Sequence, residues 1–228
     1  MKIEYEFILP GREPLIIGMI WQNDRYILQN PAPAAADWTL MSCQQCRHCP
    51  YQQPENSPAH CPVAVNLNGL LPHFGHLLSF DQLEVIIRLP ERTLQQHVSA
   101  QQVLCALLGL LFASSGCPHT EFLLPMARFH APFASAEETT WRACGSFLLG
   151  QHFRHKAGLP VESLDNLIER YEGLEIINAA MAKRLRSQVS NDALVNAVVI
   201  LDSFAKGIPF YIEQELENLR LLYRHYLQ

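Results

Sequence analysis

The chain has 228 residues, a formal net charge of −5 and 49% hydrophobic residues, so it can bury a sizeable core without disulfides. A mildly acidic chain lacks the basic surface that nucleic-acid binding requires, and we expect no nucleic-acid partner. The longest apolar run, residues 103–113, is too short to cross a bilayer, so we expect no membrane partner. One basic cluster, residues 183–186, lies near a predicted helix end, where the helix dipole favours cations.

The first 29 residues predict a small antiparallel β-meander. Apolar residues alternate with polar ones from residue 2 to residue 9, which is the period of a strand with one buried face. Two further strands are expected over residues 15–21 and 25–28, with turn-forming residues between them. The stretch LEVIIRL, residues 83–89, has the composition of a fourth strand that joins the meander.

Residues 30–62 form a connection that is rich in Pro, Ala, Gln and Cys and has no apolar periodicity. A long connection without structure of its own is uncommon in a compact domain. Something must therefore order it, and a bound metal ion would do so.

The rest of the chain, residues 63–228, predicts a helix bundle. Helices are expected over residues 63–78 with a break at Pro72, and over 91–115, 119–129, 135–157, 163–189, 190–207 and from there to about 226. The clearest start signal is the capping box of Ser135 and Glu138. The predicted fold class is α+β, mostly α, with the meander, the connection and the bundle forming one compact domain.

Four cysteines lie within the connection. Cys43, Cys46 and Cys49 follow one another at Cys-x2-Cys spacing, and Cys61 comes later. A Cys-x2-Cys turn places two thiolates on one side of a loop, as tetrahedral zinc coordination requires. An iron–sulfur cluster is the alternative, although ferredoxins have a shorter gap to their last cysteine. The third alternative is that no metal binds, because free cysteine is also a small buried hydrophobe.

The fourth ligand is open at this point. Cys117 is remote in sequence, but it shares the Cys-Pro step of Cys49 and Cys61. If Cys117 is a ligand, Cys43 is dispensable and the metal joins the connection to the bundle. His48 and His60 are weaker candidates.

Two stretches resemble a family of uncharacterised bacterial proteins, a domain of unknown function. They are CRHCP with the later CPVA, residues 46–64, and CPHTEFLLPMARFHAPF, residues 117–133. Residues 192–205 are similar to the same family, so the resemblance covers nearly the whole chain. It implies no activity. It favours one ligand set, with Cys43 as a local extra: Cys46, Cys49, Cys61 and Cys117.

The leading hypothesis is a protein whose thiolate-bound zinc is structural and which works as an interaction or regulatory module with an unidentified protein partner. Seven cysteines without an apparent export signal favour the cytoplasm. The common nucleotide-binding, hydrolase and metalloprotease motifs are missing, so an enzyme is not the first expectation. The alternatives are an iron–sulfur redox or sensor protein, and an enzyme with a polar pocket around His119, Glu121 and His130.

One polar residue stands out on a predicted apolar face. Asn178 falls on the apolar stripe of the 163–189 helix. Because buried polar groups are normally paired, we expect it to join a hydrogen-bonded network between helices.

Overall fold

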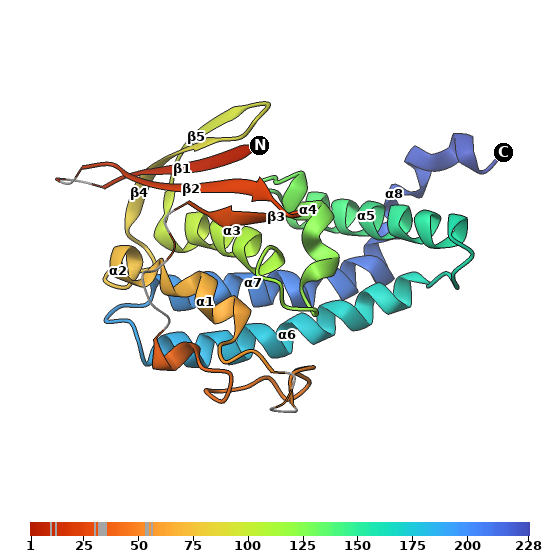
Figure 1. Cartoon of the computed structure of the whole chain (residues 1–228). Coiled ribbons are helices and arrows are strands. Elements are labelled where there is room, and N and C mark those ends of the chain that lie inside the picture. The colour runs from red at the N-terminus through yellow and green to blue at the C-terminus, as the bar shows by residue number, and fades with distance from the viewer. Residues whose placement is uncertain (10, 12, 30, 32–35, 53–54, 56) are drawn as a thin grey trace.

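A computed structural model describes the chain apart from residues 10, 12, 30, 32–35, 53–54 and 56 (Figure 1). Several residues of the predicted 30–62 connection therefore lie outside the described residues. The fold is α+β and mostly α, as predicted from the sequence.

The N-terminal part forms a five-stranded antiparallel sheet with the order β3-β2-β1-β4-β5. The strands are β1 (Lys2–Ile8), β2 (Leu15–Gln22), β3 (Arg25–Leu28), β4 (Gln82–Arg88) and β5 (Thr93–Ser99). The predicted meander is confirmed, and the predicted fourth strand pairs with β1, where Tyr5 lies opposite Ile87. On β1, Ile3, Tyr5 and Phe7 are buried, as the alternation predicts.

The helix predicted over residues 91–115 is wrong in its first part. Residues 93–99 form β5, an edge strand, and α3 (Ala100–Ala113) begins only after it. The side chains of β5 are mostly exposed and polar, so the strand lacks the alternation that marks one buried face. The true helix start carries a Ser-x-x-Gln capping box, in which Gln102 Oε1 accepts from the backbone N–H of Ser99 at 3.2 Å.

The remaining helices follow the prediction more closely. They are α1 (Pro62–Asn68), α2 (Leu71–Phe74), α4 (Leu124–Arg128), α5 (Ala136–Lys156), α6 (Leu164–Arg186), α7 (Ala193–Phe210) and α8 (Leu216–Leu219). The predicted break near Pro72 separates α1 from α2, and the capping box at Ser135 starts α5. Beyond Pro209, a π-helical turn over residues 211–215 connects α7 to α8.

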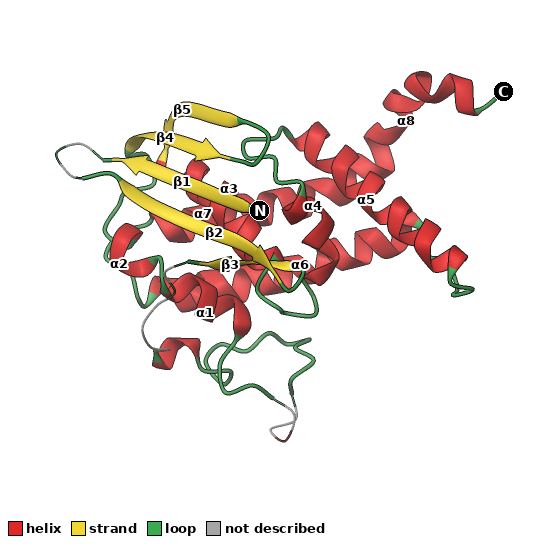
Figure 2. Cartoon of the chain, turned by 45° about the horizontal axis from the view of Figure 1, so that its top comes forward, coloured by secondary structure: helices red, strands yellow, loops and turns green. Residues whose placement is uncertain are grey.

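The elements form layers. The sheet covers α3, and α3 in turn packs on α7, which lies along α6 (Figures 1 and 2). The C-terminal turns project away from this body. The core joins the layers, since Phe7 of β1 meets Phe74 of α2 with ring centroids 4.7 Å apart.

One helix among the described residues, Ala193–Gln214, is long and apolar enough to cross a membrane by length and composition. It packs against α3 and α6, and Ala197 and Val198 belong to the core. Part of this helix therefore belongs to the core of the domain.

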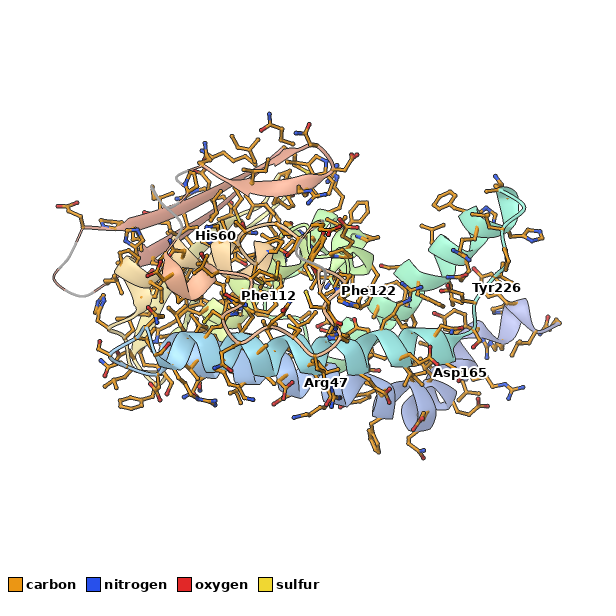
Figure 3. The ribbon with its side chains drawn as sticks, turned by 60° about the horizontal axis from the view of Figure 1, so that its bottom comes forward. Arg47, His60, Phe112, Phe122, Asp165 and Tyr226 are labelled. Atoms are coloured by element: carbon orange, nitrogen blue, oxygen red, sulfur yellow. The ribbon has the colours of Figure 1, made fainter. Side chains whose placement is uncertain are left out.

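The Cys-rich segment, by which we mean the described residues of 37–61 (37–52, 55 and 57–61), lies on the side of the molecule away from the sheet (Figures 1 and 3). Figure 3 shows Arg47 of this segment beside α6. In agreement with this placement, the ring of His48 lies against Gly173 of α6.

Candidate functional site

Main-chain hydrogen bonds close the Cys-rich segment at its base. The backbone N–H of Met41 donates to the carbonyl of Ala59 at 2.9 Å, and that of Cys61 donates to the carbonyl of Thr39 at 2.8 Å. The two ends of the segment therefore lie side by side, and Cys61 is held next to the segment's beginning.

A tight turn joins Cys46 and Cys49, as the Cys-x2-Cys spacing predicts. The backbone N–H of Cys49 donates to the carbonyl of Cys46 at 3.0 Å, and the Cys49 thiol lies 3.9 Å from the sulfur of Met41. Cys61 directly precedes Pro62, the first residue of α1. Local contacts thus fix the backbone path at all three cysteines.

Cys117 comes from a different part of the chain, just after α3. Gly116 has φ +85°, a conformation that favours glycine and turns the chain past the helix end. The backbone N–H of Cys117 donates to Ser115 Oγ at 3.2 Å. Burial raises the pKa of the Cys117 thiol to about 11, while hydrogen bonds from the backbone N–H groups of His119 and Thr120 lower it.

Four thiols line one small cavity of about 20 Å³, which we call the sulfur cavity. Ile177 and Met181 of α6 form part of its wall. The cysteines that line it are Cys46, Cys49, Cys61 and Cys117. Cys43 is not among its lining residues, so the structure brings together the set favoured by the family resemblance.

The thiols of this cavity influence one another. Burial first, and then the charges of Cys61, Cys49 and Cys117, raise the pKa of Cys46 to about 12. Several thiolates therefore cannot coexist here without a nearby cation. Among the described residues, no group of three or more His, Cys, Asp or Glu side chains has the arrangement of a metal site, and the ligand set stays a prediction.

Arg184 of α6 is a site residue that the sequence did not reveal. Its side chain is 1% exposed, and Nη1 donates to the carbonyls of Trp38 and Leu40 at 2.8 Å each. The positive charge lies close enough to the sulfur cavity to lower the pKa of Cys46. The sequence placed Arg184 in a basic cluster near a helix end, but its side chain is buried while Lys183 and Arg186 are exposed.

Two histidines stack beside the sulfur cavity. The rings of His48 and His119 lie 4.1 Å apart and nearly parallel, and His119 Nε2 is 2.8 Å from the carbonyl oxygen of His48. Both ring nitrogens of His48 are buried, and the backbone of Gly173 lies close enough to influence the ring. Burial and the neighbouring His119 lower the pKa of His48, so this ring is neutral near pH 7.

The structure separates the three residues of the predicted polar pocket. His119 lines the sulfur cavity, whereas Glu121 pairs with Arg25 at 3.5 Å and lines a cavity between α5 and α6. His130 lines a third cavity and is hydrogen-bonded to Tyr5 at 2.5 Å. These residues do not form one catalytic pocket.

Comparison with known proteins gives one match. A family model with the description "Domain of unknown function (DUF6901)" matches residues 3–224. None of the curated proteins and none of the solved structures matches the chain.

Proposed function

Because the chain belongs to the DUF6901 family, whose description assigns no activity, we propose a function from the chain's own geometry. The four thiols of the sulfur cavity bind a single zinc ion, and this ion fixes the Cys-rich segment to the helical body. The protein then serves as an interaction or regulatory module in the cytoplasm, with another protein as its partner.

The convergence of the cysteines is the observation that carries the proposal. Cys46 and Cys49 come from one turn, Cys61 from the start of α1 and Cys117 from the end of α3, yet all of them line a single cavity. Thiolates are soft ligands that suit tetrahedral zinc. A site with four thiolates has no open position for a substrate, so its role would be structural.

The charge of Arg184 supports the same proposal. A buried guanidinium without a carboxylate is unfavourable unless negative charge lies nearby. No ion pair involves Arg184 among the described residues. Zinc with four thiolates would carry a net charge of about −2, and this charge would compensate Arg184 while the N–H groups of His119 and Thr120 stabilise the Cys117 sulfur.

The size of the sulfur cavity favours one ion over a cluster. A cavity of about 20 Å³ has room for roughly one small sphere, whereas an iron–sulfur cluster contains several iron and sulfide atoms. Zinc coordination requires the cysteine side chains to rotate towards the centre of the cavity. Such a rotation would move each side chain from one staggered position to another.

Metal analysis tests the proposal directly. Purified under reducing conditions without added metal, the full chain should carry about one equivalent of zinc and should be colourless. A brown protein with visible absorption and bound iron would contradict the zinc proposal and support the iron–sulfur alternative.

Matched cysteine variants test the ligand set. Cys49→Ser should lose the zinc and several kcal/mol of stability, because metal-binding energy is folding energy at such a site. Cys43→Ser, which alters a thiol outside the cavity, should keep both the bound zinc and the stability of the unaltered chain. Retention of zinc and of the melting temperature in Cys49→Ser would contradict the proposal.

A further inference from the structure

A large cavity lies between α3 and the pair formed by α6 and α7, on the side towards α5. Its volume is about 530 Å³, within the range of sites that enclose small organic ligands. Phe112, on its wall, is seen between the sheet and α6 in Figure 3. The exposed side chains of Gln96 and Gln102 lie at its edge, so the cavity opens to solvent beside β5. We call it the apolar cavity.

Apolar side chains from three helices form most of its wall. They include Leu110 of α3, Leu174 of α6, and Leu201 and Phe204 of α7. Gly109 also lines the cavity, and a Cβ atom there would lie 3.5 Å from Leu201. A mainly hydrocarbon ligand would replace water along these walls, and its binding would be driven by burial of apolar surface.

Arg142 is the one charged residue among the described residues that line this cavity. Its Nη2 atom donates to the carbonyls of Met126 at 3.0 Å and Phe129 at 2.7 Å, which leaves the donors on Nη1 and Nε available. Glu138, the carboxylate that influences the pKa of Arg142, accepts from the backbone N–H of Ser135 at 2.7 Å. A half-buried guanidinium on an apolar wall is suited to a carboxylate, which it can bind through two parallel hydrogen bonds.

Asn178 provides a second, independent sign of a ligand. Its side chain is 4% exposed and lines the apolar cavity. Contrary to the expected helix-docking network, its amide has no protein hydrogen-bond partner among the described residues, and its polar atoms are not among the completely shielded ones, so the amide is accessible from the cavity. Water in the cavity can bond to this amide, and a polar group on a bound molecule would take the place of that water.

Arg142 of α5 and Asn178 of α6 lie near different places along α6. Tyr171 is close to Arg142, since each influences the pKa of the other. Asn178 follows Tyr171 by two helical turns on the same face, which corresponds to about 10 Å along the helix axis. Leu174 lies between them on the cavity wall.

We propose that the apolar cavity binds an amphipathic organic carboxylate, with its carboxylate on Arg142 and its apolar body along α6 towards Asn178. A second polar group at the far end of the ligand, such as a hydroxyl, bonds to Asn178. The apolar cavity and the sulfur cavity share no lining residue. Binding is therefore separate from the zinc site and should persist in Cys49→Ser molecules that remain folded.

Calorimetric titration of the full chain with decanoate, 10-hydroxydecanoate and decanol tests this proposal. Decanoate should bind at least about tenfold more tightly than decanol, because only the acid can pair with Arg142. The hydroxy acid should bind more tightly still. Equal affinities for acid and alcohol, or no binding of either acid, would overturn the proposal.

Two variants locate the binding groups. Arg142→Gln should weaken the binding of decanoate at least about tenfold and leave the affinity for decanol unchanged. Arg154→Gln, on the same helix but outside this cavity, should change the affinity for neither compound. Asn178→Leu replaces an unpartnered amide with an apolar group of similar size and should fold. It should abolish the preference for the hydroxy acid, and an unchanged preference would remove Asn178 from the site.

Discussion

Arg184 ties the beginning of the Cys-rich segment to α6. Besides the two bonds from Nη1, its Nη2 lies 3.4 Å from the carbonyl oxygen of Met41. One side chain thus contacts three carbonyls within the four residues 38–41. The backbone N–H of Cys61 also donates to the carbonyl of Thr39 in this stretch. Arg184 therefore helps to fix the position of Cys61.

Replacement of Arg184 should be strongly destabilising. Arg184→Met removes the donors and leaves buried carbonyls without partners, and we expect the free energy of unfolding to fall by about 3 kcal/mol. Urea unfolding followed by circular dichroism would measure this change. Arg186→Met, on the exposed side of the same turn, should stay within about 0.5 kcal/mol of the unaltered chain. Equal effects of the two substitutions would contradict the anchoring role.

The candidate site could be predicted only in part from its residues. Cys46, Cys49 and Cys61 could be predicted as metal ligands from their residue type and spacing. The family resemblance added Cys117 to this set. Arg184 gave no such signal, because its acceptors are backbone carbonyls and these have no side-chain signature. Asn178 was recognised on an apolar face, but the cavity beside it depends on packing between helices that are distant in sequence.

At the scale of elements, the start of α5 rests on a reciprocal cap. Ser135 Oγ accepts from the backbone N–H of Glu138 at 3.1 Å, while the Glu138 carboxylate accepts from that of Ser135 at 2.7 Å. The position of this helix start matters beyond α5, because Glu138 would otherwise be free to pair with Arg142 of the apolar cavity.

We predict that Ser135→Ala lowers the free energy of unfolding by about 1 kcal/mol, the usual cost of losing a cap. Ser135→Asp keeps an oxygen acceptor at the same position and should be close to neutral. Thermal and urea unfolding of the two variants would make the comparison. An alanine variant as stable as the aspartate variant would show that the cap does not limit stability.

Strands β1 and β5 show why some element boundaries could be predicted from the sequence and others could not. β1 has one face on the core and one towards solvent, so its apolar residues alternate and its strand was predicted. β5 lies at the sheet edge with most of its side chains exposed, and its position depends on pairing with β4, in which Val85 faces Gln96. Such pairing is a tertiary property, and the local sequence of β5 does not encode it. The capping box at Ser99 was the available signal for the start of α3.

At the scale of the whole molecule, a partly buried hydrogen bond joins the sheet to the α4–α5 connection. Tyr5 of β1 is fully buried, and its hydroxyl lies 2.5 Å from Nε2 of His130. Burial raises the pKa of Tyr5 well above its usual value, so this hydroxyl stays protonated and can donate to a neutral imidazole. The two bonded residues are 125 positions apart in sequence and belong to different layers.

The burial of His130 should make the stability of the protein depend on acid pH. Burial, and then the charge of Arg142, lower the pKa of His130 from 6.5 to about 3. Between these two values the unfolded chain binds a proton that the folded chain does not, so stability falls as the pH falls. Above about pH 7 the ring is neutral in both states, and this group adds no pH dependence there.

His130→Gln should flatten this part of the profile, because Gln can accept from Tyr5 but does not titrate. We expect the unaltered chain to lose about 3 kcal/mol more than the variant between pH 7 and pH 3. This loss is below that implied by the full pKa shift, because part of the imidazole remains reachable by solvent. Urea unfolding at a series of pH values would give both curves. Thiolates and all other titrating groups are common to the two proteins, so parallel curves would mean that His130 is not the group that links stability to acid.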